Sequence, residues 1–173
     1  MTLASWNDSE FIKGTFTASG FSIEGSLDGT VYSDHSPIGN AAILVFTAPA
    51  TALSPGDIVY APYAVRLDST STSNGTVTVT SAATSGVVAG LTYSLVKTST
   101  FSCNQSSAAA GVVVIPAGTA VGVVPASTTF PVAMGAGSDA GAPEELCLVV
   151  TAGETLTQLQ TGTATFEFAA VSN

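Results

Sequence analysis

Few side chains of this 173-residue chain could perform chemistry, and its single histidine is the most reactive of them. His35 lies in the polar stretch YSDHSP, next to Ser33 and Asp34, which are the residue types of a Ser-His-Asp triad. A serine hydrolase also needs its nucleophile on a sharp turn, and no G-x-S-x-G motif occurs. One histidine cannot supply the H-E-x-x-H pair of a zinc protease. We therefore expect His35 to be a solvated loop residue, and we do not expect an enzyme.

The acidic residues do not form a recognisable catalytic or metal-binding pattern. Glu144 and Glu145 are adjacent, so their side chains point to opposite sides of an extended chain, which is poor geometry for paired acid-base work. No D-x-[DN]-x-[DN]-G calcium loop occurs either. We expect no metal and no other cofactor. The alternative is a calcium ion held by loop carbonyls together with Asp28, Asp34, Asp57 or Asp139.

The two cysteines, Cys103 and Cys147, indicate an oxidising compartment. An even cysteine count in a β-rich chain is most simply a disulfide, and the alternative is two separate buried thiols. A bond between them would close a loop of about 45 residues and stabilise the fold by roughly 4 kcal/mol. We therefore predict a disulfide-bonded protein that is secreted or lies at the cell surface.

Charge is scarce and acidic, which narrows the choice of partners. Charged residues make up 9% of the chain, against about 25% in ordinary globular domains. The chain has twelve acidic residues and only three basic ones, Lys13, Arg66 and Lys97, which gives a net charge of -9. Nucleic acids and anionic membranes reward clustered basic residues, so neither is an expected partner. No apolar run reaches transmembrane length, so no membrane insertion of the mature form is expected.

The apolar pattern is short and alternating, which predicts strands. Ser, Thr, Gly and Val dominate, and Gly and Pro separate the apolar runs. The residues before and after Gly20 place apolar side chains on opposite faces, which predicts a bulge there, and Pro62 marks an edge or a bulge. Only residues 85–99 are expected to carry a helical turn. The predicted strands are 41–48, as a central strand covered on both sides, and 57–69, 75–81, 111–115, 120–124, 145–150 and 163–171.

These strands predict an all-β fold, a jelly-roll-like sandwich of two sheets. A Greek-key connection of the strands is equally compatible with the pattern. We expect residues 11–173 to form a single domain, preceded by an extended N-terminal arm of residues 1–10. No internal repeat and no long linker suggests a second domain.

Three blocks of the chain resemble a known family. LASWNDSEFIKGTFTASGFSIEGSLDG is similar to the start of proteins with SipW-type alternate signal peptides, where an aromatic residue and an Asp-Ser pair precede x-G-T-F-x-x-G-x-[FL]-x-[LI]. The residues at these positions are Trp6, Asp8, Ser9, Gly14, Thr15, Phe16, Phe21 and Ile23. Residues 53–81 resemble the second block of that family, and TGTATFEFAAVSN resembles its last strand, whereas 85–160 have no counterpart in these blocks.

The family is TasA- and camelysin-like, and the resemblance implies a secreted jelly-roll subunit of extracellular biofilm or surface fibres, built by donor-strand exchange. Camelysin relatives have been described as proteases, but the zinc motif that such a role needs is missing here. The cysteine pair departs from the best-known member.

The N-terminal arm has the physical properties of a donated strand. Ten extended residues span about 33 Å, which is enough to cross a neighbouring molecule. An open sheet edge would offer backbone groups to such a strand, and repeated head-to-tail donation would give an open filament of identical copies. We assign the interface to Leu3, Ala4, Trp6 and Phe11.

Two alternatives remain open at this stage. The arm could fold back as an edge strand of its own domain. The protein could instead be a monomeric adhesin or carbohydrate-binding module, in which an open row of aromatic side chains stacks on sugars. The candidate side chains for that row are Tyr32, Tyr60, Tyr63 and Trp6.

Overall fold

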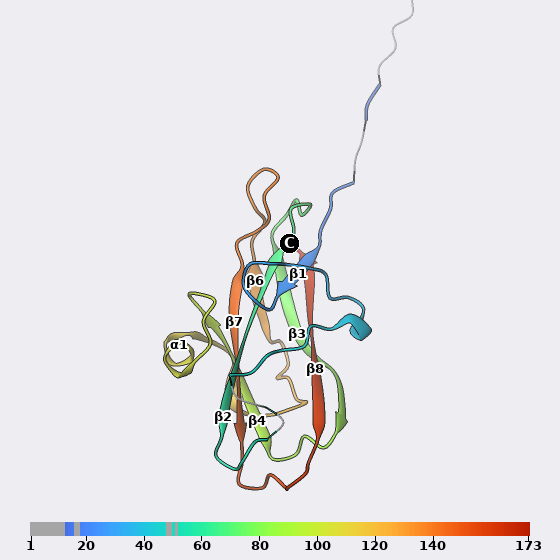
Figure 1. The fold of residues 1–173 in the computed structure, drawn as a ribbon. Helices are drawn as coiled ribbons and strands as arrows, with labels where there is room; N and C mark the ends of the chain where they lie inside the picture. The colour runs from blue at the N-terminus through green and yellow to red at the C-terminus, as the bar shows by residue number, and fades with distance from the viewer. Residues whose placement is uncertain (1–12, 16–17, 48–49, 51) are drawn as a thin grey trace, which may run out of the picture.

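The computed structural model describes residues 13–15, 18–47, 50 and 52–173, most of which form two antiparallel sheets (Figure 1). One sheet has the strand order β1-β2-β7-β4-β5 and the other β6-β3-β8. The elements are β1 (Ile23–Ser26), η1 (Ile38–Asn40), β2 (Ile58–Leu67), β3 (Gly75–Gly86), β4 (Leu91–Thr98), α1 (Gln105–Ala110), β5 (Val112–Ala120), β6 (Thr129–Val132), β7 (Glu144–Ala152) and β8 (Gly162–Ser172). The predicted all-β two-sheet sandwich is confirmed.

The core lies between the two sheets and follows the period-2 pattern of the strands. Inward side chains of β2, β4, β5 and β7 meet those of β3 and β6 in one apolar cluster. Its buried members are Val65, Leu67, Val77, Val79, Tyr93, Leu95, Ile115, Phe130, Val132, Leu146 and Leu148. Strand β8 contributes no fully buried side chain to this cluster, because its Phe166, Phe168 and Ala170 are only half-buried.

The pairing of β3 with β8 extends well beyond the core. Strand β6 pairs only with residues 75–78 of β3, whereas β8 follows β3 along its whole length. A register shift between Ser81 and Ala83 places the extra residue in β3, so β8 itself stays regular. Residues 80–86 of β3 are exposed, and this end of the three-stranded sheet is a two-stranded ribbon.

The prediction of a central strand at 41–48 is wrong. Residues 41–47, called the crossing segment below, are extended but belong to neither sheet. They run from η1 across the open side of the sandwich to β2 (Figure 1). Only alternate side chains face the core, so Leu44 and Phe46 are half-buried while Ile43 and Val45 are 83% and 73% exposed. The continuous apolar run therefore does not mark a strand covered on both faces.

Two further predictions of secondary structure, one of a helical turn and one of a strand, are wrong because the chain turns at a glycine in each place. The helical turn expected in 85–99 does not form, because the chain turns at Gly90, with φ +82°, and continues as β4. The strand expected at 120–124 is absent, because β5 runs to Ala120 and the chain turns at Gly122, with φ +91°.

The bulge predicted at Gly20 is also replaced by a different feature. Gly20 makes an isolated parallel bridge to Ser71, and a Cβ at this position would lie 2.6 Å from the Thr70 carbonyl oxygen. Close backbone approach, and not a bulge within a strand, is the reason for glycine here.

The sequence analysis did not predict the short helix α1, although the sequence contains the residues of its N-terminal capping box. Asn104 accepts hydrogen bonds from the backbone N–H groups of Ser106 and Ser107, and the Ser107 hydroxyl accepts one from the Asn104 N–H. This reciprocal capping box fixes the start of the helix. No helix among the described residues is long and apolar enough to cross a membrane.

Candidate functional site: an open seam between the two sheets

The region around His35 lacks the geometry of a catalytic triad. The His35 Nε2 atom lies 3.3 Å from the Ser33 hydroxyl, and its Nδ1 atom lies 3.5 Å from the Tyr63 hydroxyl. The Asp34 carboxylate instead accepts hydrogen bonds from the backbone N–H and the hydroxyl of Ser36. These bonds lower the pKa of Asp34, and no hydrogen bond joins its carboxylate to the imidazole. The three residue types are adjacent, but the acid does not orient the base.

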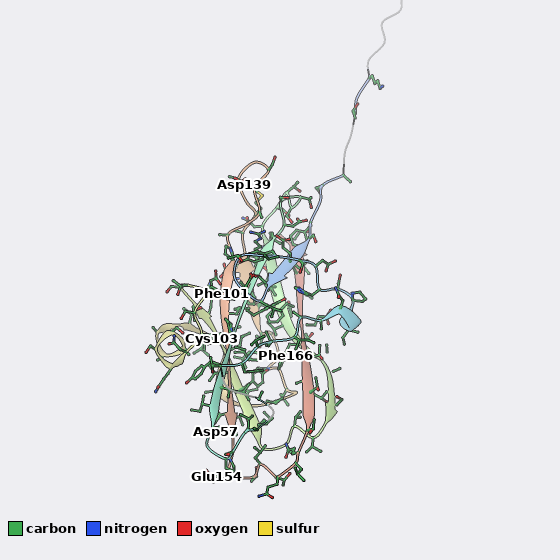
Figure 2. The ribbon with its side chains drawn as sticks, viewed as in Figure 1. Asp57, Phe101, Cys103, Asp139, Glu154 and Phe166 are labelled. Carbon is green, nitrogen blue, oxygen red and sulfur yellow. A yellow bond between two sulfur atoms is a disulfide. The ribbon has the colours of Figure 1, made fainter. Side chains whose placement is uncertain are left out.

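The loop carboxylates are used locally and lie far apart. Asp28 accepts bonds from the backbone N–H groups of Val31 and Thr30 and from the Ser26 hydroxyl, which lowers its pKa to about 2. Asp139 and Asp57 lie near opposite ends of the sandwich (Figure 2). No group of three His, Cys, Asp or Glu side chains within the described ranges could hold a metal ion.

The predicted disulfide is confirmed, and it lies on the side of the five-stranded sheet that faces away from the core. Cys103 and Cys147 are joined, and both are buried, at 8% and 0% exposure. Cys147 alternates with the core residues Leu146 and Leu148 of β7, so its side chain points to the opposite face. The loop that carries Cys103 continues into α1, which therefore covers this face next to β4 and β7 (Figure 1).

A charged cluster covers the same outer face closer to β1. Arg66 pairs with Glu24 at 2.7 Å, and its guanidinium lies 3.8 Å from the centre of the Tyr32 ring. The Glu145 Oε2 and Tyr32 hydroxyl oxygens are buried and have no hydrogen-bond partner in the part of the chain that the structure describes. Burial raises the pKa of Glu145, and the neighbouring Glu144 raises it further. The side chains of this cluster cover the outer face of the sheet. Burying the Glu145 carboxylate next to Glu144 is electrostatically unfavourable.

The predicted donor residues Leu3, Ala4, Trp6 and Phe11 lie outside the described residues, as does the whole of the arm 1–10. The described chain begins at Lys13, and residues 13–15 are exposed and lie clear of both sheets (Figure 1). Residues 13–15 lie at the end of the sandwich where the C-terminus also lies (Figure 1).

The most conspicuous feature of the described chain is an apolar seam between β2 and β8. A cavity of about 670 Å³ lies there between the two sheets. Its lining is mostly apolar, with His35 and a few other polar residues at its border, and it includes core residues of β2, β4 and β7, the inward side chains of β8 and residues of the crossing segment. The residues of this seam that matter below are Leu44, Phe46, Tyr63, Ala164, Phe166 and Phe168.

Strand β8 borders this seam with an unpaired edge. Within the described residues β8 pairs only with β3. The Asn173 N–H donates to the Asn74 carbonyl at one end, and the Val87 N–H donates to the Thr161 carbonyl at the other. With the register of β3 and β8, these bonds mean that the backbone N–H and C=O groups of the odd-numbered residues of β8 point towards β3. The backbone groups of the even-numbered residues, Ala164, Phe166, Phe168 and Ala170 among them, therefore face the free edge, and their side chains face the seam.

The edge of β8 lacks the usual protection against pairing. Exposed strand edges are commonly blocked by proline, lysine, bulges or short length. Strand β8 has 11 residues, no proline and no lysine, and the carboxylate of its single charged residue, Glu167, is exposed and lies 3.5 Å from the Thr80 hydroxyl of β3. Such an edge is a template for another strand.

A second opening, between β5 and β6, is smaller and better protected. Its volume is about 420 Å³, and its lining includes Lys97, Pro125 and Pro131. Strand β6 has only four residues, and β5 contains Pro116 and has register shifts against β4. The seam beside β8 is therefore the better acceptor for a strand.

The tyrosines do not form the open aromatic row expected of an adhesin. Tyr63 packs against the core, with its ring 6.0 Å from that of Phe168. Tyr32 lies beneath Arg66 on the outer face of the sheet. Tyr60 is half-buried on β2, and Trp6 lies outside the described residues.

No protein-family model matches this chain, and no curated protein matches its sequence. The resemblance to the TasA- and camelysin-like proteins therefore rests on the three sequence blocks alone.

Sequence reasoning did not locate the free edge of β8 or the seam beside it. The signal was present in TFEF (165–168), where phenylalanines alternate with polar residues in a strand free of proline and lysine. The sequence could not reveal that β8 lies at an edge, because edge position depends on the order of strands in the sheet.

Proposed function

We propose that this protein is a structural subunit of an extracellular fibre, which polymerises head-to-tail by donating residues 1–10 to the seam of the next copy. The observation that carries the proposal is the unprotected 11-residue edge of β8 beside an apolar cavity. A donated strand would provide partners for the free backbone groups of β8 and apolar side chains for the seam, which is β-augmentation. The partner in this proposal is another copy of the same chain.

The position of the chain start supports donation to a neighbour. Residues 13–15 are exposed and lie beyond the end of the sandwich (Figure 1), whereas the seam lies between β2 and β8. The twelve residues before Lys13 reach about 40 Å when extended, so they can span the length of a seam in another copy. Because the donor end and the acceptor seam are different surfaces, repetition gives an open filament.

The remaining properties fit a fibre outside the cell. The disulfide is stable in oxidising compartments, and the low content of charged side chains together with many hydroxyl side chains is typical of secreted β domains. The resemblance to TasA- and camelysin-like fibre proteins points in the same direction. Secretion, the fibre and the donor role of Leu3, Ala4, Trp6 and Phe11 all belong to this proposal.

Deleting residues 1–10 tests the proposal. The full chain is expected to form filaments at high concentration, and the truncated chain is expected to remain a folded monomer, as judged by size-exclusion chromatography and negative-stain microscopy. A matched control replaces residues 1–10 by a Gly-Ser segment of equal length, and it should also stay monomeric because it lacks the apolar side chains. Filaments formed by the truncated chain would rule out donation by this arm.

A further inference from the structure

The crossing segment is extended and apolar, but it is not part of a sheet. Its two ends are held: the Ala41 N–H donates to the Ile38 carbonyl at 3.2 Å, and the Thr47 N–H donates to the Tyr60 carbonyl at 2.9 Å. The Tyr60 N–H also donates to the Thr47 hydroxyl, at 3.3 Å. Between these ends, residues 42–46 form no hydrogen bond to another described residue. A backbone without ladder bonds belongs to the least stable part of a fold.

Side-chain burial alone keeps the middle of the segment in place. Leu44 and Phe46 are half-buried, line the seam and pack against the core cluster. Ile43 and Val45 are 83% and 73% exposed, and of these two only Ile43 also borders the cavity. The segment therefore covers the seam with two large side chains, while the backbone of residues 42–46 has no hydrogen-bond partner among the described residues.

The segment also lies where a donated strand would have to enter. It crosses the open side of the sandwich towards β2, and its residues line the same cavity as residues 162–168 of β8 (Figure 1). A strand lying along the free edge of β8 would bring its own side chains into the space that Leu44 and Phe46 now cover. The donated strand and the crossing segment therefore cannot occupy this space at the same time.

We infer that the crossing segment is a displaceable strap, which closes the seam in the isolated subunit and leaves it when the arm of another copy enters. This inference rests on the proposed function. The strap shields the apolar seam before assembly, and its missing ladder bonds let it leave without breaking a sheet. The incoming strand gains the ladder bonds that the strap lacks, because it runs along β8. Strap release is then a step that limits the rate of assembly.

A disulfide lock tests the strap directly. The Thr47 and Tyr60 backbones are hydrogen-bonded neighbours, so the double variant Thr47→Cys/Tyr60→Cys places two cysteines within reach of each other. The oxidised variant should remain monomeric under conditions in which the wild type forms filaments, and a reducing agent should restore assembly. Wild type treated with the same reductant controls for the native disulfide, whose sulfurs are buried.

The two ways to fail are distinguishable. An oxidised variant that assembles at the wild-type rate, with the new disulfide verified by mass spectrometry, overturns the strap and leaves the fibre proposal standing. A wild-type protein that forms no filaments overturns the fibre proposal, and the strap with it.

A matched pair of point variants on the strap provides a second test. Leu44→Ser weakens the inward packing and should shorten the assembly lag by about fivefold, since half-burying a leucine stabilises docking by that order. Val45→Ser changes an exposed side chain that does not line the cavity and should leave the lag unchanged. A lag that does not shorten in Leu44→Ser, or that shortens equally in Val45→Ser, would overturn the strap.

Discussion

The two sides of the five-stranded sheet differ in how they are covered. On the outer side, the disulfide, the capped helix α1 and the Arg66–Glu24 pair hold the covering elements in place. On the inner side next to β8, the seam is covered by the crossing segment, whose residues 42–46 have no backbone bond to another described residue. The comparison shows that the two sides are held by different means. A disulfide, a helix cap and an ion pair fix the outer cover, whereas only side-chain burial and the bonds at its two ends hold the segment over the seam.

Proline on the edge of β8 gives the largest expected effect. Ala164→Pro removes a backbone N–H that faces the free edge, so the subunit should keep its melting temperature while filament formation falls at least tenfold. Ala169→Lys is the matched control, because Ala169 is exposed and its side chain points away from the seam. Light scattering and thermal melts provide the two readouts. Normal assembly of Ala164→Pro would show that β8 is not the acceptor.

Removing the disulfide should weaken the covered side and leave the seam intact. Cys103→Ala/Cys147→Ala opens a loop between residues 44 apart in sequence, which is expected to lower the free energy of unfolding by about 4 kcal/mol. Chemical denaturation measures this change. Well below the melting temperature, the variant should still form filaments, and a loss of filaments from a folded variant would show that the two sides of the sheet are coupled.

The cap of α1 should have a smaller effect on the same side. Asn104→Ala removes the side-chain acceptor of the capping box and is expected to cost about 1 kcal/mol. The melting temperature measures this loss, and Ser99→Ala is the control, because Ser99 is exposed and its side chain forms no hydrogen bond with another described residue. An unchanged melt would mean that α1 contributes nothing to the covering of the disulfide.

The smallest effect concerns the carboxylate of Glu145. Because its pKa is raised, the native state binds a proton more readily than the unfolded chain, so wild-type stability should rise as the pH falls from neutral towards about 4. Glu145→Gln should melt slightly higher than wild type at pH 7 and lose this rise. Melting curves at several pH values test it, and parallel profiles of the two proteins would contradict the assignment.

Local patterns predicted much of the framework of this fold. The alternation in residues 57–69 and 163–171 marked β2 and β8, and the cysteine count predicted the disulfide. The apolar run at 41–48 led to the wrong prediction of a central strand, because a segment that crosses between sheets can have the same composition as a buried strand. The seam was beyond prediction, since it arises from strand order and from the incomplete burial of Phe166 and Phe168, which are properties of the assembled sheets.

A reconstruction of the filament by electron cryo-microscopy would be the most direct measurement. It should show residues 1–10 of one copy as an added strand along β8 of the next, continuous with Lys13 of the donor, with residues 41–47 of the acceptor moved out of the seam. Filaments in which β8 has no added strand, or in which each copy keeps its first ten residues on its own sandwich, would contradict donation.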